Sequence, residues 1–235
     1  YPEKAWFVIR SKLGRYTATT NARLASLANP MYTGSNGRSE GMRRIYYPDY
    51  VLKDNKHMRR GRLCEPHILK EFSERMGIEL IQSPLAVDIF DIREAATADA
   101  VGIEAKCPVR AYDAPQAQHV VQVSKQINVH RLPFGYLVCS SATGVRQCWR
   151  IHRDAAFYNW FMGLSRRAAR YIDARILPPK SMARNYSLLK QAIEDRLEGK
   201  EISTVPCPRI ERVEEACYTA EPVWKMVPEL ADDYE

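Results

Sequence analysis

The sequence predicts an α/β fold with three layers, in which a small mixed β-sheet is flanked by helices. Two observations lead to this prediction. Apolar residues at helical spacing alternate along the chain with short β-branched segments, in the order helix, β-hairpin, helix, two strands, two helices. Hydrophobic residues make up 46% of the 235 residues, which is enough for a substantial core.

The N-terminal region is expected to be helical at first and then irregular. Residues 3–30 predict a helix, a turn and a second helix. Thr17–Asn21 supplies N-cap chemistry ahead of Ala22–Leu27. Residues 30–50 contain several turn-forming pairs and predict a mobile basic loop or a short helix.

A helix followed by a hairpin is predicted next. Residues 61–76 show helical spacing of apolar residues, with Pro66 in the first turn and Gly77 as the stop. Residues 78–92 and 95–107 then predict two extended segments, because β-branched residues run or alternate through the first of them.

The second half of the predicted core alternates helices and strands. An amphipathic pattern predicts a helix over 114–130, and continuous apolar residues predict a buried strand over 134–140. The later elements are a turn at Ser141–Gly144, a strand over 145–151, and helices over 154–174 and 181–198 as a C-terminal helical extension. The predicted domain spans residues 1–199, and residues 200–235 are an acidic, weakly patterned tail.

Charge is distributed unevenly along the chain. The formal net charge is +7, and residues 1–62 carry 13 Lys and Arg against 4 Asp and Glu. Residues 200–235 carry 4 basic against 9 acidic residues. A basic front end favours a polyanionic partner such as nucleic acid.

The six cysteines and five histidines show none of the spacings of a zinc site. The thiols are expected to be reduced, as in an intracellular protein. No apolar stretch approaches the roughly 18 residues of a membrane span, and no signal peptide is visible. We therefore expect an intracellular protein that is neither secreted nor bound to a membrane.

Glu104-Ala105-Lys106, at the end of an apolar run, is the most informative motif. In a strand this spacing places the carboxylate and the ammonium on one face, with Ala105 on the other. A metal-dependent phosphodiesterase needs such a pair. The carboxylate holds a hard divalent cation, and the amine lies beside the attacking water and the developing phosphate charge.

An aspartate close to Glu104 would complete a cation site, and three candidates precede it. A two-residue turn at Val101-Gly102 would place Asp99 opposite Glu104 on paired strands. Asp88 and Asp91 are the alternatives. We rank Asp99 first on its local pattern.

Several motifs in order resemble one nuclease family. They are Trp6-x-x-x-Arg10 followed by Leu13–Thr19, then Gly61-Arg62-Leu63-Cys64-Glu65, then Ala96–Pro108 with Asp99 and the Glu-x-Lys-Cys-Pro run, then Gln118–Gln126. Over roughly residues 5–155 the pattern is similar to the λ-exonuclease/YqaJ-type viral recombinase nucleases, a branch of the PD-(D/E)xK superfamily. The resemblance implies a restriction-endonuclease-like core. The chain departs from the family at Ala98, where a proline is usual, and in the short spacing from Asp99 to Glu104.

The resemblance implies roles for particular residues. Asp99, Glu104 and the Ala105 carbonyl would hold Mg²⁺ or Mn²⁺, and Glu65 would bind a second cation or its water. Lys106 would assist the attacking water, and Gln122, with Gln118 one turn earlier, would face the site from the following helix. The residues expected to grip a 5′ phosphate are Arg10, Arg15 and Thr19, with Arg15 competing with Arg10 for that role.

The implied activity is that of a Mg²⁺- or Mn²⁺-dependent deoxyribonuclease in recombination or viral DNA processing, acting as a 5′–3′ exonuclease on double-stranded DNA ends. Relatives often work with a single-strand annealing protein and often form homo-oligomers. Two alternatives stay open. One is an endonuclease of the same fold acting on DNA branches or RNA, and the other is a catalytically eroded DNA-binding module.

Overall fold

Within the described residues, the central sheet has five strands in the order β3-β4-β5-β6, with β7 also paired to β5. The structure is a computed structural model that describes residues 16–28, 43, 45–47, 55–88, 94–176, 179, 184–201 and 204–230. The strands are β3 Ile103–Lys106, β4 Phe134–Ser140, β5 Val145–His152, β6 Ile210–Arg212 and β7 Tyr218–Thr219.

The sheet is mixed, as the sequence predicts. β3 and β4 run parallel and are joined by the crossover helix α6 Ala117–Val129, whereas β4 and β5 form an antiparallel hairpin. β6 and β7 both add to β5 in antiparallel orientation. Among the described strands, β3 is therefore an edge strand of the sheet, a position in which groups from the helices on either side can approach it.

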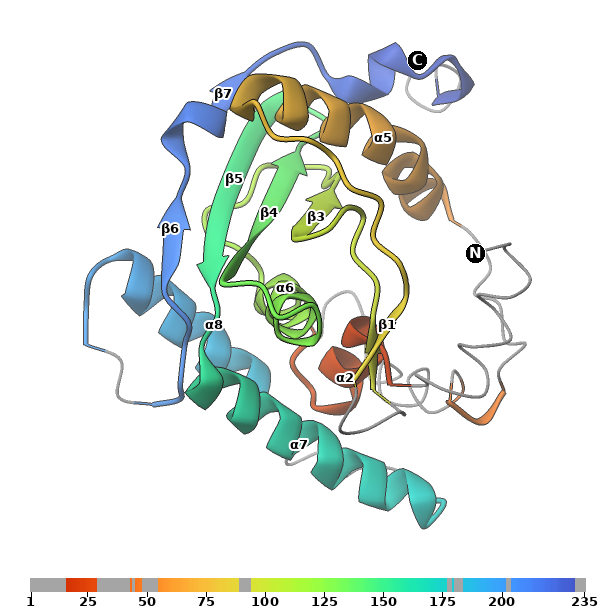
Figure 1. The fold of residues 1–235 in the computed structure, drawn as a ribbon, viewed down its shortest axis with the longest axis vertical. Coiled ribbons are helices and arrows are strands. Elements are labelled where there is room, and N and C mark those ends of the chain that lie inside the picture. Colours follow the sequence, from red (N-terminus) through yellow and green to blue (C-terminus); the bar gives the residue numbers. More distant parts are fainter. Residues whose placement is uncertain are drawn as a thin grey trace.

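Helices cover both faces of the sheet (Figure 1). One face packs against α2 Ala18–Leu24, α6, α7 Ala155–Asp173 and α8 Arg184–Leu197, and the other face packs against α5 Lys56–Met76. The side chains of β4 alternate between these two cores, with Leu137 and Cys139 in the first and Tyr136 and Val138 in the second. The predicted three-layer α/β architecture is confirmed.

Helix α5 begins earlier than the sequence predicts. Asn55 caps it, since its Oδ1 accepts hydrogen bonds from the backbone N–H groups of His57 and Met58, both at 3.0 Å. The helix ends at Gly77, whose φ of 63° is left-handed, as expected. Pro66 consequently lies inside the helix rather than in its first turn, so that part of the prediction is wrong.

The predicted hairpin over 78–92 and 95–107 is replaced by shorter pieces. β1 Ala86–Val87 pairs with β2 Ala95–Ala96 as a separate two-stranded ribbon. After β2 the chain turns and enters the main sheet as β3, so one long extended segment was the wrong expectation. Helix α2 likewise begins before Ala22, because Thr17 is the residue that caps it.

The segment after residue 199 packs into the same core as the rest of the chain. It contributes β6, β7 and three short 3₁₀ helices, η3 Glu214–Ala216, η4 Val223–Met226 and η5 Pro228–Leu230. Apolar side chains of this segment pack against α5, namely Val213, Ala216, Val223, Val227 and Leu230. Of the helices in the described ranges, none combines the length and the apolar character that a membrane crossing requires.

Candidate active site

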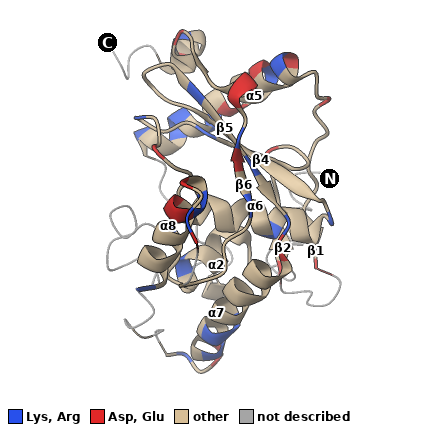
Figure 2. Ribbon diagram, turned by 90° about the vertical axis from the view of Figure 1, so that its left-hand side faces the viewer, with Lys and Arg blue, Asp and Glu red and all other residues tan. Residues whose placement is uncertain are grey.

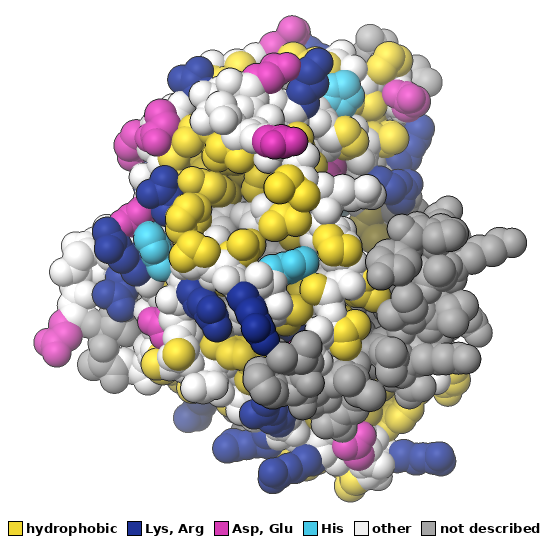
Figure 3. All heavy atoms as spheres, in the orientation of Figure 1, with side chains coloured by type: hydrophobic (Ala, Val, Ile, Leu, Met, Phe, Trp, Pro, Cys, Tyr) yellow, Lys and Arg dark blue, Asp and Glu magenta, His cyan; other side chains and the backbone are white. Residues whose placement is uncertain are grey.

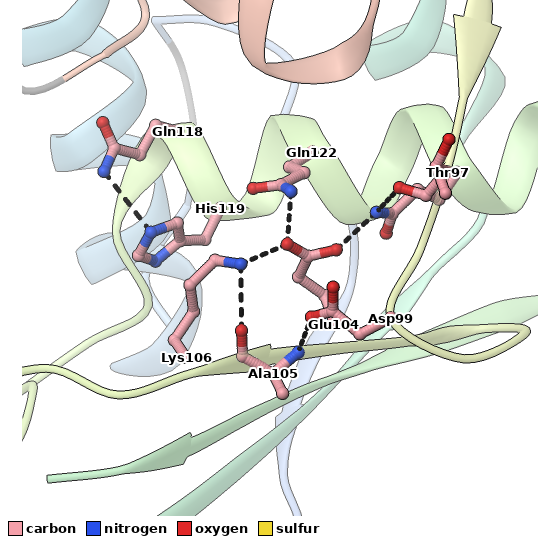
Figure 4. Close-up of polar contacts among 9 residues, drawn as sticks. Thr97, Asp99, Glu104, Ala105, Lys106, Gln118, His119 and Gln122 are labelled. Carbon is pink, nitrogen blue, oxygen red and sulfur yellow. Dashed lines mark hydrogen bonds and ion pairs between the residues drawn. The ribbon is translucent and has the colours of Figure 1, made fainter. Parts of the chain in front are cut away.

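Glu104 and Lys106 point from edge strand β3 toward helix α6 (Figure 4). The alternate residues of the strand, Ile103 and Ala105, belong to the core under α5. The period-2 pattern of the sequence thus fixes which side chains meet α6. The Glu104 side chain is 2% exposed and that of Lys106 is 24% exposed, so the pair lies at a boundary between core and solvent.

Three cationic or amide groups hold the Glu104 carboxylate. Its Oε1 accepts from Lys106 Nζ and Gln122 Nε2, and its Oε2 accepts from Gln126 Nε2. Gln126 also donates to the carbonyl of Thr97 at 2.9 Å. Burial raises the pKa of Glu104 to about 7, with Asp99 adding to the rise and Lys106 and Gln126 opposing it.

A tight turn brings Asp99 to the same place. Ala100 and Ile103 form an antiparallel bridge across Val101-Gly102, and Gly102 takes a φ of 73°, which favours glycine. The Asp99 Oδ2 accepts a hydrogen bond of 2.7 Å from the backbone N–H of Ala105. The two-residue turn expected from the sequence therefore exists, and Asp99 lies beside Glu104.

Of the two alternative aspartates, the structure describes Asp88, and it lies elsewhere. Asp88 interacts with the hydroxyl of Tyr158 on α7, and its backbone N–H donates to the carbonyl of Glu94 at 2.8 Å. Asp91 lies outside the described residues. Of the candidates that the structure describes, Asp99 is the one brought to Glu104.

Glu65 reaches the site from α5, on the opposite side of the edge strand from α6. Burial raises the pKa of Glu65 to about 7, and the neighbouring Asp99 and Glu104 carboxylates raise it further while Lys106 lowers it. A Gly-x-x-x-Glu pattern alone is a weak indication of a metal site. Here, however, Glu65 adds a third carboxyl group beside those of Asp99 and Glu104.

The Lys106 ammonium bridges two oxygens that the resemblance assigns to a cation. Nζ contacts Glu104 Oε1 and donates to the Ala105 carbonyl at 2.9 Å. Burial alone lowers the pKa of Lys106, but Glu104 and Asp99 outweigh it and the pKa is raised. A positive charge therefore already occupies the point between these two oxygens.

The donor chemistry of the site suits Mg²⁺ or Mn²⁺. Carboxylates and a backbone carbonyl are the hard oxygen ligands that these ions prefer. A divalent cation would relieve the repulsion between carboxylates that, after burial, raises the pKa of Glu65 and Glu104. As the side chains lie, no three His, Cys, Asp or Glu within the described residues are close enough together to hold a metal ion. Binding would require Lys106 Nζ to leave the Glu104 carboxylate.

The sequence identified Gln122 but missed Gln126. Gln118 contacts Gln116 and His119 instead of Glu104. Gln126 follows Gln122 by four residues and thus lies on the same helix face, which is the signal that could have found it. The two amides together hold both oxygens of Glu104.

A second buried ion pair lies under the site and was not predicted. Lys125 Nζ contacts Glu94 Oε2 and the carbonyl of Tyr16, and Asn21 Nδ2 donates to Glu94 Oε2 at 2.8 Å. This network ties α2 to α6. Thr19, on α2, is half-buried near it, while Arg10 and Arg15 lie outside the described residues.

A cavity of about 740 Å³ opens beside Cys107, which follows Lys106 in sequence. Arg60, 2% exposed, donates to the Cys107 carbonyl at 2.9 Å in its wall. The remaining wall comes from the start of α5, the segment after β3 and the start of α6, namely Asn55, His57, Met58, Cys107, Pro108, Val109, Arg110, Ala111, Tyr112, Gln116, Gln118 and His119. The cavity combines basic, amide and aromatic groups next to the candidate catalytic lysine.

No protein-family model and no curated protein matches the chain. Several solved structures, however, are similar to it. The structure of LHK-Exo in complex with dAMP has a TM-score of 0.59 and 20% identity, covering 78% of this chain and 98% of its own. The alkaline exonuclease LHK-Exo from Laribacter hongkongensis gives 0.58 and 21% over the same shares. A phage-related exonuclease from Haemophilus somnus 129PT gives 0.54 and 10%, covering 68% and 94%. The fold of this chain is thus the fold of known exonucleases.

Proposed function

We propose that the chain is a Mg²⁺- or Mn²⁺-dependent deoxyribonuclease that acts as a 5′–3′ exonuclease on double-stranded DNA ends. The observation that carries the proposal is the gathering of Glu65, Asp99 and Glu104 around one edge strand, with the Lys106 ammonium among them. Carboxylates crowded in this way repel one another, and proteins retain such an arrangement where it binds a cation. The likeness in fold to three exonuclease structures supports the same class of reaction.

Each residue of the site has a separate task in phosphodiester hydrolysis. Asp99, Glu104 and the Ala105 carbonyl would hold the cation, with Glu65 holding a second cation or its water. When bound, the cation supplies charge that stabilises the attacking and leaving oxygens of an in-line displacement. Lys106 would position the attacking water and offset the negative charge that builds up on the phosphoryl oxygens.

The two glutamines of α6 position the carboxylate. Gln122 and Gln126 donate to opposite oxygens of Glu104 and so fix the plane of its carboxyl group. Their amides would keep that plane when Lys106 moves away from Oε1. The geometry of the site thus depends on α6 as much as on β3.

Basic side chains give the chain a surface for a polyanion. Figure 2 shows Lys and Arg gathered at the far end of α7, where Arg166, Arg167 and Arg170 are exposed. The face in Figure 3 also carries a group of Lys and Arg side chains next to hydrophobic ones. Such a surface favours a DNA backbone without specifying a sequence. In this proposal Arg10, Arg15 and Thr19 grip the 5′ phosphate of the DNA end.

A catalytically eroded DNA-binding module is the second candidate, and one observation favours it. Lys106 occupies the place between Glu104 and the Ala105 carbonyl, and the described carboxylates do not converge on one point. If that arrangement persisted with Mg²⁺ present, the chain would bind DNA and leave it intact.

Matched aspartate variants distinguish the two candidates. Purified wild-type protein with Mg²⁺ should degrade a linear duplex and leave a covalently closed circle intact, and Asp99→Asn should remove that activity. Asp88→Asn is the control, because Asp88 faces Tyr158, and it should cut like the wild type. Degradation of the circle at a comparable rate would replace the exonuclease by an endonuclease. DNA binding without cleavage of either substrate would establish the eroded module.

A further inference from the structure

Two thiols lie next to the candidate active site, and the proposed chemistry uses neither. Cys64 precedes Glu65 on α5, and Cys107 follows Lys106 at the end of β3. Cys64 belongs to the hydrophobic cluster under α5, Cys107 packs against the same cluster, and the two side chains interact with each other. The bond from Arg60 to the Cys107 carbonyl holds α5 against Cys107 one turn before Cys64. All six cysteines of the chain are free thiols.

The two thiols differ in access. Cys64 is 0% exposed, so no reagent reaches it from solvent. Cys107 is half-buried and forms part of the wall of the 740 Å³ cavity, so a small molecule that enters the cavity meets this residue, whereas it does not meet Cys64. In pairs of one accessible and one protected thiol, the accessible thiol is oxidised first. The protected thiol then reacts with the oxidised sulfur to form a disulfide.

We propose that Cys107 is an oxidative modification site for peroxides and that Cys64 is its resolving partner. The Cys107 thiolate attacks one oxygen of hydrogen peroxide, the O–O bond breaks, and Cys107 sulfenic acid and hydroxide form. The Cys64 sulfur then attacks the Cys107 sulfur, and the S–O bond breaks. The departing hydroxide takes the Cys64 thiol proton and leaves as water. Two thiols are oxidised to one disulfide, and the peroxide is reduced to two waters.

The disulfide would change the geometry of the neighbouring site. An S–S bond measures about 2.05 Å, well below the separation of two sulfurs that are not bonded, so its formation draws α5 and the end of β3 together. Glu65 and Lys106 are the residues next to the two sulfurs in sequence. A misplacement of about 1 Å costs on the order of 100-fold in rate. This loss of activity rests on the proposed nuclease function, whereas formation of the disulfide does not.

The other thiols provide internal comparisons. Cys139 faces Lys106 in the register of β3 and β4 but is 1% exposed. Cys217 donates to the carbonyls of Val213 and Cys148, at 3.2 and 3.9 Å, and borders neither the cavity nor the candidate site. A reaction without selectivity would involve Cys139 or Cys217 as readily as Cys64.

The test uses the full chain and hydrogen peroxide. The protein is treated, quenched with catalase, alkylated and digested, and its peptides are identified by mass spectrometry. The expected result is a cross-linked peptide pair containing Cys64 and Cys107, with the loss of two of the six free thiols. A cross-link from Cys107 to Cys139, or no loss of thiols at Cys107 while other cysteines oxidise, would overturn the proposal.

Two variants and an activity assay sharpen the test. Without its resolving partner in Cys64→Ala, Cys107 should proceed to the sulfinic acid, which dithiothreitol does not reduce. Cys217→Ala should still form the Cys64–Cys107 bond. Peroxide should lower the nuclease rate of the wild type by at least about tenfold, and dithiothreitol should restore it. A disulfide that forms without changing the rate would refute the effect on activity. A reduced protein that cuts no DNA yet forms the disulfide would refute the nuclease function and keep the modification site.

Discussion

Two lysine–glutamate pairs lie within the same region of the molecule and differ in what surrounds them. The Lys125–Glu94 pair is enclosed, with side chains 0% and 6% exposed, and it joins Asn21 and the Tyr16 carbonyl. The Lys106–Glu104 pair lies at the sheet edge, with Lys106 24% exposed and two further carboxyl groups beside it. Among the described residues, the first pair sets one positive charge against one negative charge, whereas the second has an excess of carboxyl groups. An enclosed, balanced pair holds a fold together, and an open pair with unbalanced charge is suited to bind a cation.

The largest expected effect is on catalysis at the open pair. Lys106→Ala should lower the DNA cleavage rate by about 10⁴-fold, because it removes both water positioning and charge stabilisation. The unfolding temperature and the affinity for DNA should stay near those of the wild type. Single-turnover cleavage, thermal unfolding and DNA-binding titration measure the three quantities. Equal cleavage by variant and wild type would show that the open pair is not catalytic.

The enclosed pair should respond in the opposite way. Lys125→Met leaves Glu94 buried without its cation, which costs about 3 to 5 kcal/mol of unfolding free energy. Denaturant unfolding measures this cost. As a matched variant, Lys106→Met should change the unfolding free energy by much less, since the Lys106 side chain is partly exposed. If both substitutions destabilised the protein equally, the contrast between the two pairs would be lost.

An amide that fixes a carboxylate is expected to matter less than the lysine. Gln126→Ala removes the donor to Glu104 Oε2 and should slow cleavage by about tenfold, the value of one buried hydrogen bond. Gln118→Ala serves as the control because Gln118 does not contact Glu104. Steady-state cleavage of a linear duplex by both variants measures the difference. If the Gln126→Ala variant were as active as Gln118→Ala, Gln126 would not be needed to orient the Glu104 carboxyl group, and Gln122 alone would do so.

The smallest expected effect is a pH-dependent one on stability without metal. The pKa of Glu65 is raised to about 7 in the folded protein, above its unfolded value. Its contribution to stability is fully present below the unfolded pKa of 4.5 and is lost as the pH rises through the folded pKa of about 7. Glu65→Gln should therefore gain about 1 kcal/mol over the wild type at pH 8 and nothing near pH 4, after allowing for solvent screening. Urea unfolding at both pH values checks this, and a variant that gains nothing at pH 8 would mean that Glu65 is not crowded by Asp99 and Glu104.

Local pattern was sufficient to predict the parts of the site that lie close together in sequence. Glu104 and Lys106 are two residues apart in a strand, so their common face follows from strand geometry. Asp99 is joined to them by a two-residue turn that glycine permits. Gln122 lies on the amphipathic helix that follows. In each case a short-range rule decides the geometry.

Contacts between distant residues could not be predicted in the same way. Glu94 and Lys125 are 31 residues apart, and no sequence rule links a charge before β3 to one inside a helix. The segment after residue 199 has few apolar residues in any regular period. Even so, Val213, Val223 and Leu230 pack under α5, because tertiary burial does not require a periodic pattern when the backbone is irregular. The start of α5 was predicted too late in the sequence, because the helix begins at the N-cap residue Asn55 and not where the apolar pattern begins.

A crystal structure of the protein soaked in Mn²⁺ tests the central account most directly, through its anomalous difference density. We expect a peak within about 2.2 Å of oxygens of Asp99, Glu104 and the Ala105 backbone, with Lys106 Nζ moved away from Glu104. A peak at Asp88 or Glu94 instead, or an undisturbed Lys106–Glu104 contact with no peak beside it at saturating Mn²⁺, would contradict the account.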